Sequence, residues 1–494
     1  MKIANLSSLL LASFSGKLIY ALASVISLPL AAYVLGAEAV GLVGFFTTLL
    51  MVLMVLEGGL TSNVIQRLAR IRGVASADRS MRSVRALVNT YLLVFSAVGL
   101  IAACAISLAS PALVSHWLKL TDISQDQALY ALYCMAIFIG LNLPVMLLQG
   151  VFVGNELQYP LNKVYIVYSL MRTLGILGLV HSVPAFGGVT GYFTLQVLIQ
   201  LMYVATLMYV LYRRDLLGAG RVHKKYVLSG LAFSRGVFLI SLTSVITVQY
   251  DKLFMSGALG LQDYAYYSLA STIAGFPYIF STAFNTVLFP RFSRDLRAGE
   301  LARIEKVFRA ALVLFALIMT IMCSAVFWYA GAALHMMFEP FLAEGIDTVV
   351  PWLLVGTALQ SLLIVPFSLQ MAAGWTSLAF RLNLVAVPII LFGLPALVAS
   401  FGAVGGAYNW LLYNAFSFGC TVYFTCRRFP WLLPAYRACL YAALVTAVMA
   451  NGLFFLCFQW LSGAVAGVVG ACLASALLAA LGAFIFRKQL AGLR

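Results

Sequence analysis

The sequence predicts an all-α integral membrane protein with about fourteen transmembrane helices, and three observations indicate this class. Hydrophobic residues make up 63% of the 494 residues and charged residues only 9%, whereas a soluble protein needs far more charge to cover its surface. Apolar runs recur along the whole chain, each long enough for a helix to cross a hydrocarbon core, which takes about 20 residues. The short alternating segments of a membrane β-barrel do not occur, so each run is expected to be a helix.

The expected spans follow one another with short connections. The first lies in MKIANLSSLLLASFSGKLIYALASVISLPLAAYVLG, which lacks the cleavage site of a secretory signal and is therefore expected to be retained. No GxxxxGK[ST] phosphate loop and no CxxC pair occurs, so we expect no ATPase domain, no metal site and no cofactor. The spans are expected to centre near Ala21, Leu50, Gly99, Ile139, Leu174, Leu201, Leu242, Ile279, Met319, Gly356, Leu391, Phe416, Val448 and Leu473.

The loops between the spans alternate in charge. RLARIRGVASADRSMRSVR, RRDLLGAGRVHKKY, PRFSRDLRAGELARIEK and RRFPWLLPAYR are basic, whereas SPALVSHWLKLTDISQDQ, GLQD and HMMFEPFLAEGIDT are neutral or acidic. Because positive loops stay in the cytoplasm, both termini are expected there, and Lys119 is the one basic residue expected in an outside loop. The net charge of +16 then reflects topology and attraction to lipid headgroups, with no nucleic acid partner needed.

Two stretches of the chain echo each other. GFFTTLLMVLMVLEGGLTSNVIQRLAR and YYSLASTIAGFPYIFSTAFNTVLFPRFSR both follow a short outside turn and end in an inside R-x-x-R. This pattern favours two six-helix lobes in parallel repeat, residues 1–213 and 229–428, with an additional helix pair at 437–486. Repeats of this kind are common in secondary transporters, whose substrate site lies between the repeats.

Ionisable residues within expected spans are the first functional candidates, because charge at bilayer depth is costly. Lys17 and Glu57 lie on consecutive helices at similar depth, roughly 12 Å from the inner end, and are expected either to pair structurally or to function. Arg172 lies at a comparable expected depth. It suits an anion such as a phosphate, which a guanidinium binds with two hydrogen bonds, or else it bonds to helix carbonyls or to Glu57.

Asp251 and Lys252 are adjacent near the outer end of the expected seventh span. Adjacent helical residues diverge by about 100°, so a self-contained salt bridge is not expected. Asp251 is predicted to act at an outer gate or in ion coupling, and Lys252 as a residue that extends to the interface or contacts substrate.

Uncharged polar residues also lie within or beside the spans. A cavity lined by amides and tyrosines would suit sugars, whereas the commoner use of such groups is to join helices. They are Asn142, Gln149, Gln196, Gln200, Gln249, Asn285, Gln360, Asn383, Asn409 and Asn414, with Tyr165, Tyr168, Tyr203 and Tyr250 nearby.

Particular stretches resemble a known family. YVLGAEAVGLVGFFTTLL with LEGGLTSNVIQRLAR, PVMLLQGVFVGNELQYPLNKV, TSVITVQYDKLFMSGALGLQDYAYYSLA and FNTVLFPRFSR, taken in order, resemble the Wzx-type polysaccharide or O-antigen flippases. These belong to the multidrug/oligosaccharidyl-lipid/polysaccharide (MOP) exporter superfamily. The resemblance covers about the first 300 residues, and the rest matches by topology. Fourteen spans departs from the twelve typical of this branch and matches the members that flip the peptidoglycan precursor.

The resemblance implies a transporter rather than an enzyme. Such proteins move an undecaprenyl-pyrophosphate-linked oligosaccharide across the bacterial inner membrane by alternating access, coupled to an ion gradient, alongside a polysaccharide polymerase and chain-length machinery. On this basis Lys17, Arg172 and Lys252 are candidate pyrophosphate or glycan contacts, and Glu57 and Asp251 are candidates for ion coupling or gating.

Three alternatives stay open. A cation-coupled multidrug exporter of the same superfamily would favour an acidic cavity, and a peptidoglycan-precursor flippase would share the span count. A membrane polysaccharide polymerase or ligase would carry a large outside loop with arginines, but the expected outside loops are short and contain none.

Overall fold

The computed structural model describes residues 23, 27, 29–74, 77–155, 157–218, 220, 222–275, 277–338, 340–375, 377–460 and 464–486. All regular secondary structure in these ranges is helical, which confirms the predicted all-α class. Lys17 lies outside the described residues, so its expected pairing with Glu57 stays a prediction.

Nine helical segments of the described ranges are long and apolar enough to cross a membrane. The total of fourteen stays a prediction, since most of the first expected span lies outside these ranges. The nine are Ala37–Glu57, Arg82–Trp117, Gln125–Gly154, Gln158–Ser182, Gly188–Tyr212, Leu301–Met337, Leu342–Ala372, Ser377–Phe401 and Pro430–Trp460.

The chain divides into two compact units, Met1–Ala265 and Tyr266–Arg494. Helix α9 of the first unit packs against α2, α3 and α4. The first unit contains α2 (Ala37–Leu53), η1 (Met54–Glu57), α3 (Leu60–Val74), α4 (Ala77–Ala112), η2 (Leu113–Trp117), α5 (Gln125–Gly154), α6 (Gln158–Leu170), η3 (Met171–Gly175), α7 (Ile176–Ser182), η4 (Pro184–Phe186), α8 (Gly188–Tyr212), α9 (Lys224–Ala258) and the start of α10 (Leu261–Gly275).

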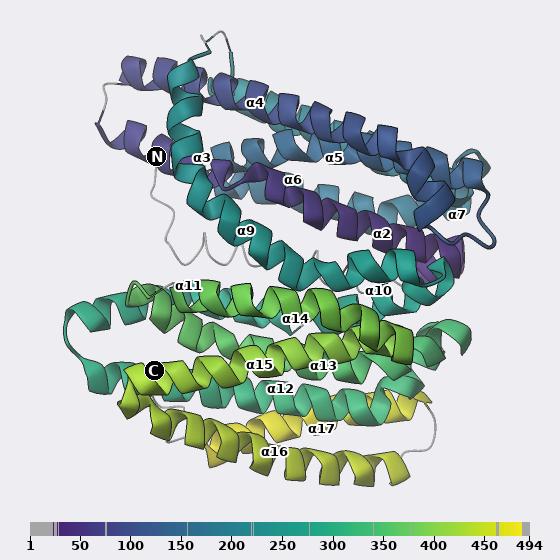
Figure 1. Ribbon diagram of the computed structural model, residues 1–494, viewed down its shortest axis with the longest axis vertical. Helices are drawn as coiled ribbons and strands as arrows, with labels where there is room; N and C mark the ends of the chain where they lie inside the picture. The colour runs from purple at the N-terminus through teal and green to yellow at the C-terminus, as the bar shows by residue number, and fades with distance from the viewer. Residues whose placement is uncertain are drawn as a thin grey trace. The chain divides into compact units, whose positions relative to one another are not determined.

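The first unit is built around α4 and α5, which lie along each other (Figure 1). Their backbones meet at Gly99 and Gly140, where a Cβ on Gly99 would lie 2.3 Å from the Gly140 carbonyl oxygen. Such small-residue contacts let membrane helices approach closely. Buried side chains of α3, α4, α5 and α8, among them Val64, Val88, Phe152 and Leu207, form the core beside this crossing.

The second unit is built around the long helix α12, which packs against α13, α16 and α17. Phe308, Leu312 and Val365 belong to its core, and α16 adds Ala442. Its helices are the rest of α10, α11 (Tyr278–Arg297), α12 (Leu301–Met337), α13 (Pro340–Ala372), α14 (Ser377–Phe401), α15 (Ala403–Arg428), η5 (Pro430–Leu432), α16 (Leu433–Trp460) and α17 (Ala464–Ile485).

Candidate functional site

A row of polar side chains follows one face of α8 in the first unit. Tyr192, Gln196, Gln200 and Tyr203 are spaced by four, four and three residues, so they share a helix face. All four are buried, although the helix around them is strongly apolar. We call these four residues and the side chains bonded to them the polar ladder. Buried polar groups require hydrogen-bond partners, so the partners of the ladder define the site.

Arg172 joins the ladder at its outer part. Its Nε donates a hydrogen bond to Oε1 of Gln196 at 3.0 Å, and Nε2 of Gln196 donates to the hydroxyl of Tyr192 at 2.9 Å. Arg172 lies in η3, a π-helical turn between α6 and α7. Such turns interrupt regular α-helices and are frequent at functional sites.

Two aromatic rings complete the surroundings of Arg172. Its guanidinium carbon lies 4.6 Å from the ring centre of Phe138 on α5 and 6.0 Å from that of Phe46 on α2. These are cation–π distances, and the two rings help to hold the guanidinium in place. At about 1.5 Å per residue, Arg172 lies about 21 Å from the start of α6, deeper than the sequence analysis expected because the helix already begins at Gln158.

The inner part of the ladder reaches α5 and α6. The Tyr168 hydroxyl donates to Oε1 of Gln200 at 2.5 Å, and Nε2 of Gln200 donates to Oδ1 of Asn142 at 3.4 Å. Nε2 of Gln149 donates to the Tyr203 hydroxyl at 3.0 Å. The rings of Tyr168 and Tyr203 stack with centres 3.9 Å apart. The structure therefore bonds Arg172 to Gln196 in one group, and beside the same face of α8 it brings together a second group formed by Asn142, Gln149, Tyr168, Gln200 and Tyr203.

Glu57 occupies a break in its span rather than the interior of a helix. The turn η1 ends at Glu57, Gly58 and Gly59 follow with φ of +57° and +75°, and α3 begins at Leu60. Oε1 of Glu57 accepts a hydrogen bond from the backbone N–H of Thr61 at 2.9 Å. A carboxylate here satisfies a free N–H and complements the positive end of the helix dipole. Glu57 thus has a clear capping role in addition to any coupling role.

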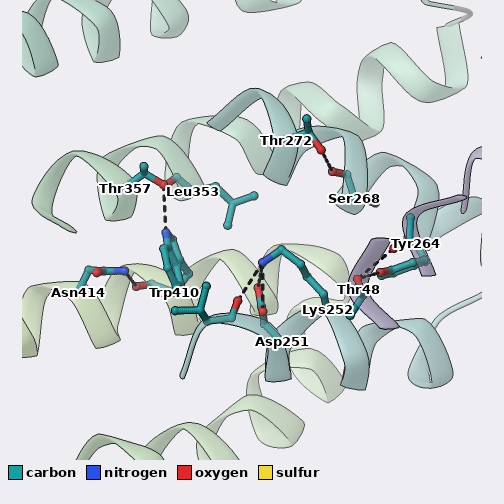
Figure 2. A network of polar contacts seen from close by, with 12 residues as sticks. Thr48, Asp251, Lys252, Tyr264, Ser268, Thr272, Leu353, Thr357, Trp410 and Asn414 are labelled. Atoms are coloured by element: carbon teal, nitrogen blue, oxygen red, sulfur yellow. Dashed lines mark hydrogen bonds and ion pairs between the residues drawn. The ribbon is translucent and has the colours of Figure 1, made fainter. Parts of the chain in front are cut away.

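Asp251 and Lys252 form a salt bridge, contrary to the sequence-based expectation. Nζ of Lys252 lies 3.2 Å from Oδ2 of Asp251 and donates to the Val248 carbonyl at 3.3 Å (Figure 2). The expectation considered only the directions of the two Cβ atoms, whereas the flexible lysine stem curls back along the helix. The Asp251 side chain is only 5% exposed and that of Lys252 22% exposed, and the role of Lys252 at the interface stays a prediction.

Glu38 is a buried carboxylate that the sequence analysis did not single out. It lies in the first turn of α2 and is 3% exposed. Its two oxygens accept hydrogen bonds from the backbone N–H groups of Thr121, Asp122 and Ile123, at 2.6, 2.5 and 2.8 Å. The available signal was an acid two residues after the glycine that precedes the helix, but its backbone partners are more than 80 residues away in sequence.

The segment just before these three residues is bonded to the last turn of α9. Nε1 of Trp117 donates to the Ser256 hydroxyl at 3.1 Å, and Nζ of Lys119 donates to the Ala258 carbonyl at 2.6 Å. A Cβ on Gly257 would lie 2.6 Å from the Trp117 ring, so only glycine allows this contact. We call this set of contacts, with those of Glu38, the outer clasp. Among the described residues, no three His, Cys, Asp or Glu side chains gather as a metal site.

The described residues form a helical protein whose long apolar helices are suited to a membrane, with a half-buried arginine beside a row of amides and tyrosines. Its fold is similar to that of the lipid II flippase MurJ in an inward closed conformation, with a TM-score of 0.70 and 13% identity over 96% of this chain and 99% of that one. It is also similar to an inward-facing multidrug resistance MATE family transporter of the MOP superfamily, with a TM-score of 0.65 and 13% identity over 86% and 94% of the two chains.

The sequence comparisons identify the family. Residues 7–295 match the profile described as polysaccharide biosynthesis protein, and the chain belongs to that family. A candidate O-antigen transporter of Shigella flexneri is 23% identical over 410 residues, which cover 79% of this chain and 91% of that protein. These findings confirm the resemblance to a polysaccharide biosynthesis family.

Proposed function

We propose that this protein is a flippase that moves an undecaprenyl-pyrophosphate-linked oligosaccharide from the cytoplasmic to the periplasmic leaflet of a bacterial inner membrane. The observation that carries the proposal is the polar ladder around Arg172, in a chain that belongs to the polysaccharide biosynthesis family. The named relatives are transporters or flippases, which supports transport without chemical change of the substrate.

The ladder offers the groups that such a substrate requires. Amides and tyrosine hydroxyls donate and accept hydrogen bonds, and aromatic faces pack against sugar rings. Arg172 supplies a positive charge at bilayer depth, held by Gln196 and Phe138, for a pyrophosphate. The lipid tail stays in the bilayer, so only the polar head crosses through protein.

The other charged candidates take distinct roles in this proposal. Lys17 contributes a second contact to the pyrophosphate, and Lys252 approaches the substrate when its pairing with Asp251 is released. Asp251 and Glu57 respond to the coupling ion as alternating access proceeds. The product is passed to a polysaccharide polymerase and its chain-length machinery on the periplasmic side.

The first test is Arg172→Ala in a strain that lacks the chromosomal copy. Removing a charged hydrogen-bonding partner costs about 1.5–3 kcal/mol, so export is expected to fall about tenfold or more. Surface polysaccharide and the pool of undecaprenyl-linked glycan are measured at equal protein levels. The control is Arg213→Ala at the exposed end of α8, which is expected to leave both unchanged.

Two outcomes contradict the proposal. Normal surface polysaccharide with Arg172→Ala would remove Arg172 from the substrate path. A deletion strain with raised drug susceptibility and no accumulated lipid-linked glycan would identify a multidrug exporter instead.

The coupling role of Glu57 is tested by Glu57→Gln. Glutamine keeps an oxygen that can accept the Thr61 N–H, so the cap of α3 is retained while the charge is removed. If Glu57 carries the proton, transport by the variant is expected to lose the pH dependence of the wild type. Equal pH dependence in both proteins would assign Glu57 to capping alone.

A further inference from the structure

A groove of about 370 Å³ lies between α6 and α8 on the first unit, separate from the contacts of Arg172. Val167 on α6 and Met202 on α8 are both 58% exposed, so the groove opens on the exposed surface of the helix pair. Apart from one lysine, two tyrosines and a threonine, its walls are aliphatic or thioether side chains. It is lined by Lys163, Val164, Val167, Tyr168, Met171, Ile199, Met202, Tyr203 and Thr206.

The groove belongs to the cytoplasmic half of the bilayer in the orientation set by the basic loops. Helix α6 begins on the inside at Gln158 and α8 ends there at Tyr212, so Lys163 and Thr206 form the inner end of the groove. Exposed Tyr159, Tyr209 and Tyr212 lie at these helix ends, as expected of the aromatic belt at a membrane interface. An open apolar groove at this depth faces lipid rather than water.

The inner end of the groove carries a positive charge. Nζ of Lys163 lies 4.7 Å from the ring centre of Tyr159, just below the interface. A lysine here combines a flexible apolar stem with an ammonium group that binds phosphate as a point charge. The groove therefore presents a cation at the headgroup level and an apolar channel beneath it.

The floor of the groove is shared with the polar ladder. The stacked rings of Tyr168 and Tyr203 line the groove, while their hydroxyls are bonded to Gln200 and Gln149. If the apolar chain of a molecule lies in the groove, a single layer of side chains thus separates its polar head from the ladder.

The second unit has a groove of similar size without this charge. It measures about 310 Å³ and lies between α14 and α15, and none of the residues that line it is charged. The two grooves therefore differ in charge. Lys163 equips the groove of the first unit to bind an anionic headgroup as well as a hydrocarbon chain.

We propose that the groove between α6 and α8 binds the phosphate-proximal isoprenoid chain of a polyprenyl pyrophosphate, with Lys163 contacting the pyrophosphate. This site rests on the proposed function and deepens it, because it gives the substrate a point of capture in the cytoplasmic leaflet before its head reaches Arg172. A linear isoprenoid fits a single narrow groove, and the pyrophosphate matches the one cation in its lining.

The test measures binding of undecaprenyl pyrophosphate and of uncharged undecaprenol to the full-length protein in phosphatidylcholine nanodiscs. Met202→Trp fills the groove and is expected to weaken binding of both probes about tenfold, because each buried methylene contributes about 0.8 kcal/mol. Leu201→Trp, on the neighbouring exposed face of the same helix, is the matched control and is expected to change neither. Val167→Trp repeats the test from the opposite wall of the groove.

Lys163→Gln separates the charge from the groove. This variant is expected to weaken the binding of undecaprenyl pyrophosphate about fivefold or more. The binding of undecaprenol is expected to stay unchanged, since only the charged probe contacts the ammonium group. Equal effects of the Met202 and Leu201 variants would overturn the proposal. Displacement of the probe by an equal amount of phosphatidylglycerol would also overturn it, by assigning the groove to ordinary phospholipid.

The experiments can contradict the groove proposal and the proposed function independently of each other. If a deletion strain accumulates lipid-linked glycan but Met202→Trp and Val167→Trp bind and export normally, the groove proposal fails and the function stands. If the variants lose binding selectively but the deletion strain accumulates no glycan, the groove stands as a polyprenyl site and the function fails.

Discussion

The two units use buried polar groups differently, and helices α8 and α15 illustrate the difference. The row on α8 leads to Arg172 through Gln196. On α15, Trp410 donates to the Thr357 hydroxyl at 3.2 Å, and Asn414 donates to the carbonyl of Trp410 at 2.8 Å (Figure 2). Both contacts on α15 are between neutral groups: the first joins α15 to α13 and the second stays within α15, whereas the row on α8 positions a charge.

The buried carboxylates of the two units differ in the same way. Glu38 in the first unit is bonded to three backbone N–H groups. Asp295 in the second unit lies 2.9 Å from Arg294 and 3.7 Å from Arg303, whose side chains are 60% and 50% exposed. Loss of Glu38 would leave one buried and two partly buried N–H groups without their carboxylate, whereas loss of Asp295 would leave arginines that water can solvate. The first unit therefore depends more on its buried charges.

The largest effect is expected for Glu38→Ala, because it removes the acceptor for three backbone N–H groups. An unsatisfied buried donor such as the Ile123 N–H costs about 1–3 kcal/mol and the two partly buried donors add less, so the free energy of unfolding is expected to fall by about 3 kcal/mol. Denaturant unfolding of the purified protein in detergent measures it. Glu344→Ala, at an exposed outer position of the second unit, is the control. A loss as small as that of Asp295→Ala would contradict the contrast between the two carboxylates.

Gln196→Leu is expected to have the next largest effect on stability and to separate the two kinds of polar row. Leucine has a similar volume but leaves the Arg172 Nε and the Tyr192 hydroxyl without their partner, at a cost of about 2 kcal/mol. Export is expected to fall as it does with Arg172→Ala, since the guanidinium loses the hydrogen bond that fixes its Nε. Glycan export measured at matched protein levels tests this prediction. Unchanged export would show that the ladder serves only to pack the helices together.

Trp410→Phe is expected to have the smallest effect. It removes one neutral hydrogen bond to Thr357 and little packing volume, which costs about 1 kcal/mol. Export is expected to stay within twofold of the wild type, because the bond that is removed joins two neutral groups. A loss of export equal to that of Gln196→Leu would show that both rows serve transport and would erase the distinction between the units.

The helical class and much of the ladder could be predicted from the sequence, because amides and an arginine in apolar runs stand out against their surroundings. Arg172, Gln196 and Gln200 were found in this way. The partners could not be predicted, since whether Arg172 meets an acid, a carbonyl or an amide depends on how helices rotate against each other. Glu38 escaped notice because its partners are backbone groups, which carry no sequence signal.

Two expectations from the sequence differ from the structure, each because of the residues immediately around the site. Glu57 was expected within a helix, although the Gly58–Gly59 pair after it is a signal for a break. The Asp251–Lys252 pair was judged from Cβ directions alone, which suit short side chains but not a lysine. The division into lobes at 213 and 229 stays a prediction, and the packing of α9 against α2, α3 and α4 now bears on where any repeat begins.

The stacked pair Tyr168 and Tyr203 has an electrical consequence. One side of this pair lines a groove open to hydrocarbon, and the hydroxyls on the other side are bonded within the ladder. Two rings 3.9 Å apart leave no room for water between them, so they insulate one medium from the other. A flippase embedded in an energised membrane must move a large polar head without short-circuiting the ion gradient. Replacing both tyrosines with alanine is therefore expected to convert the protein into a leak, seen as proton current across liposomes.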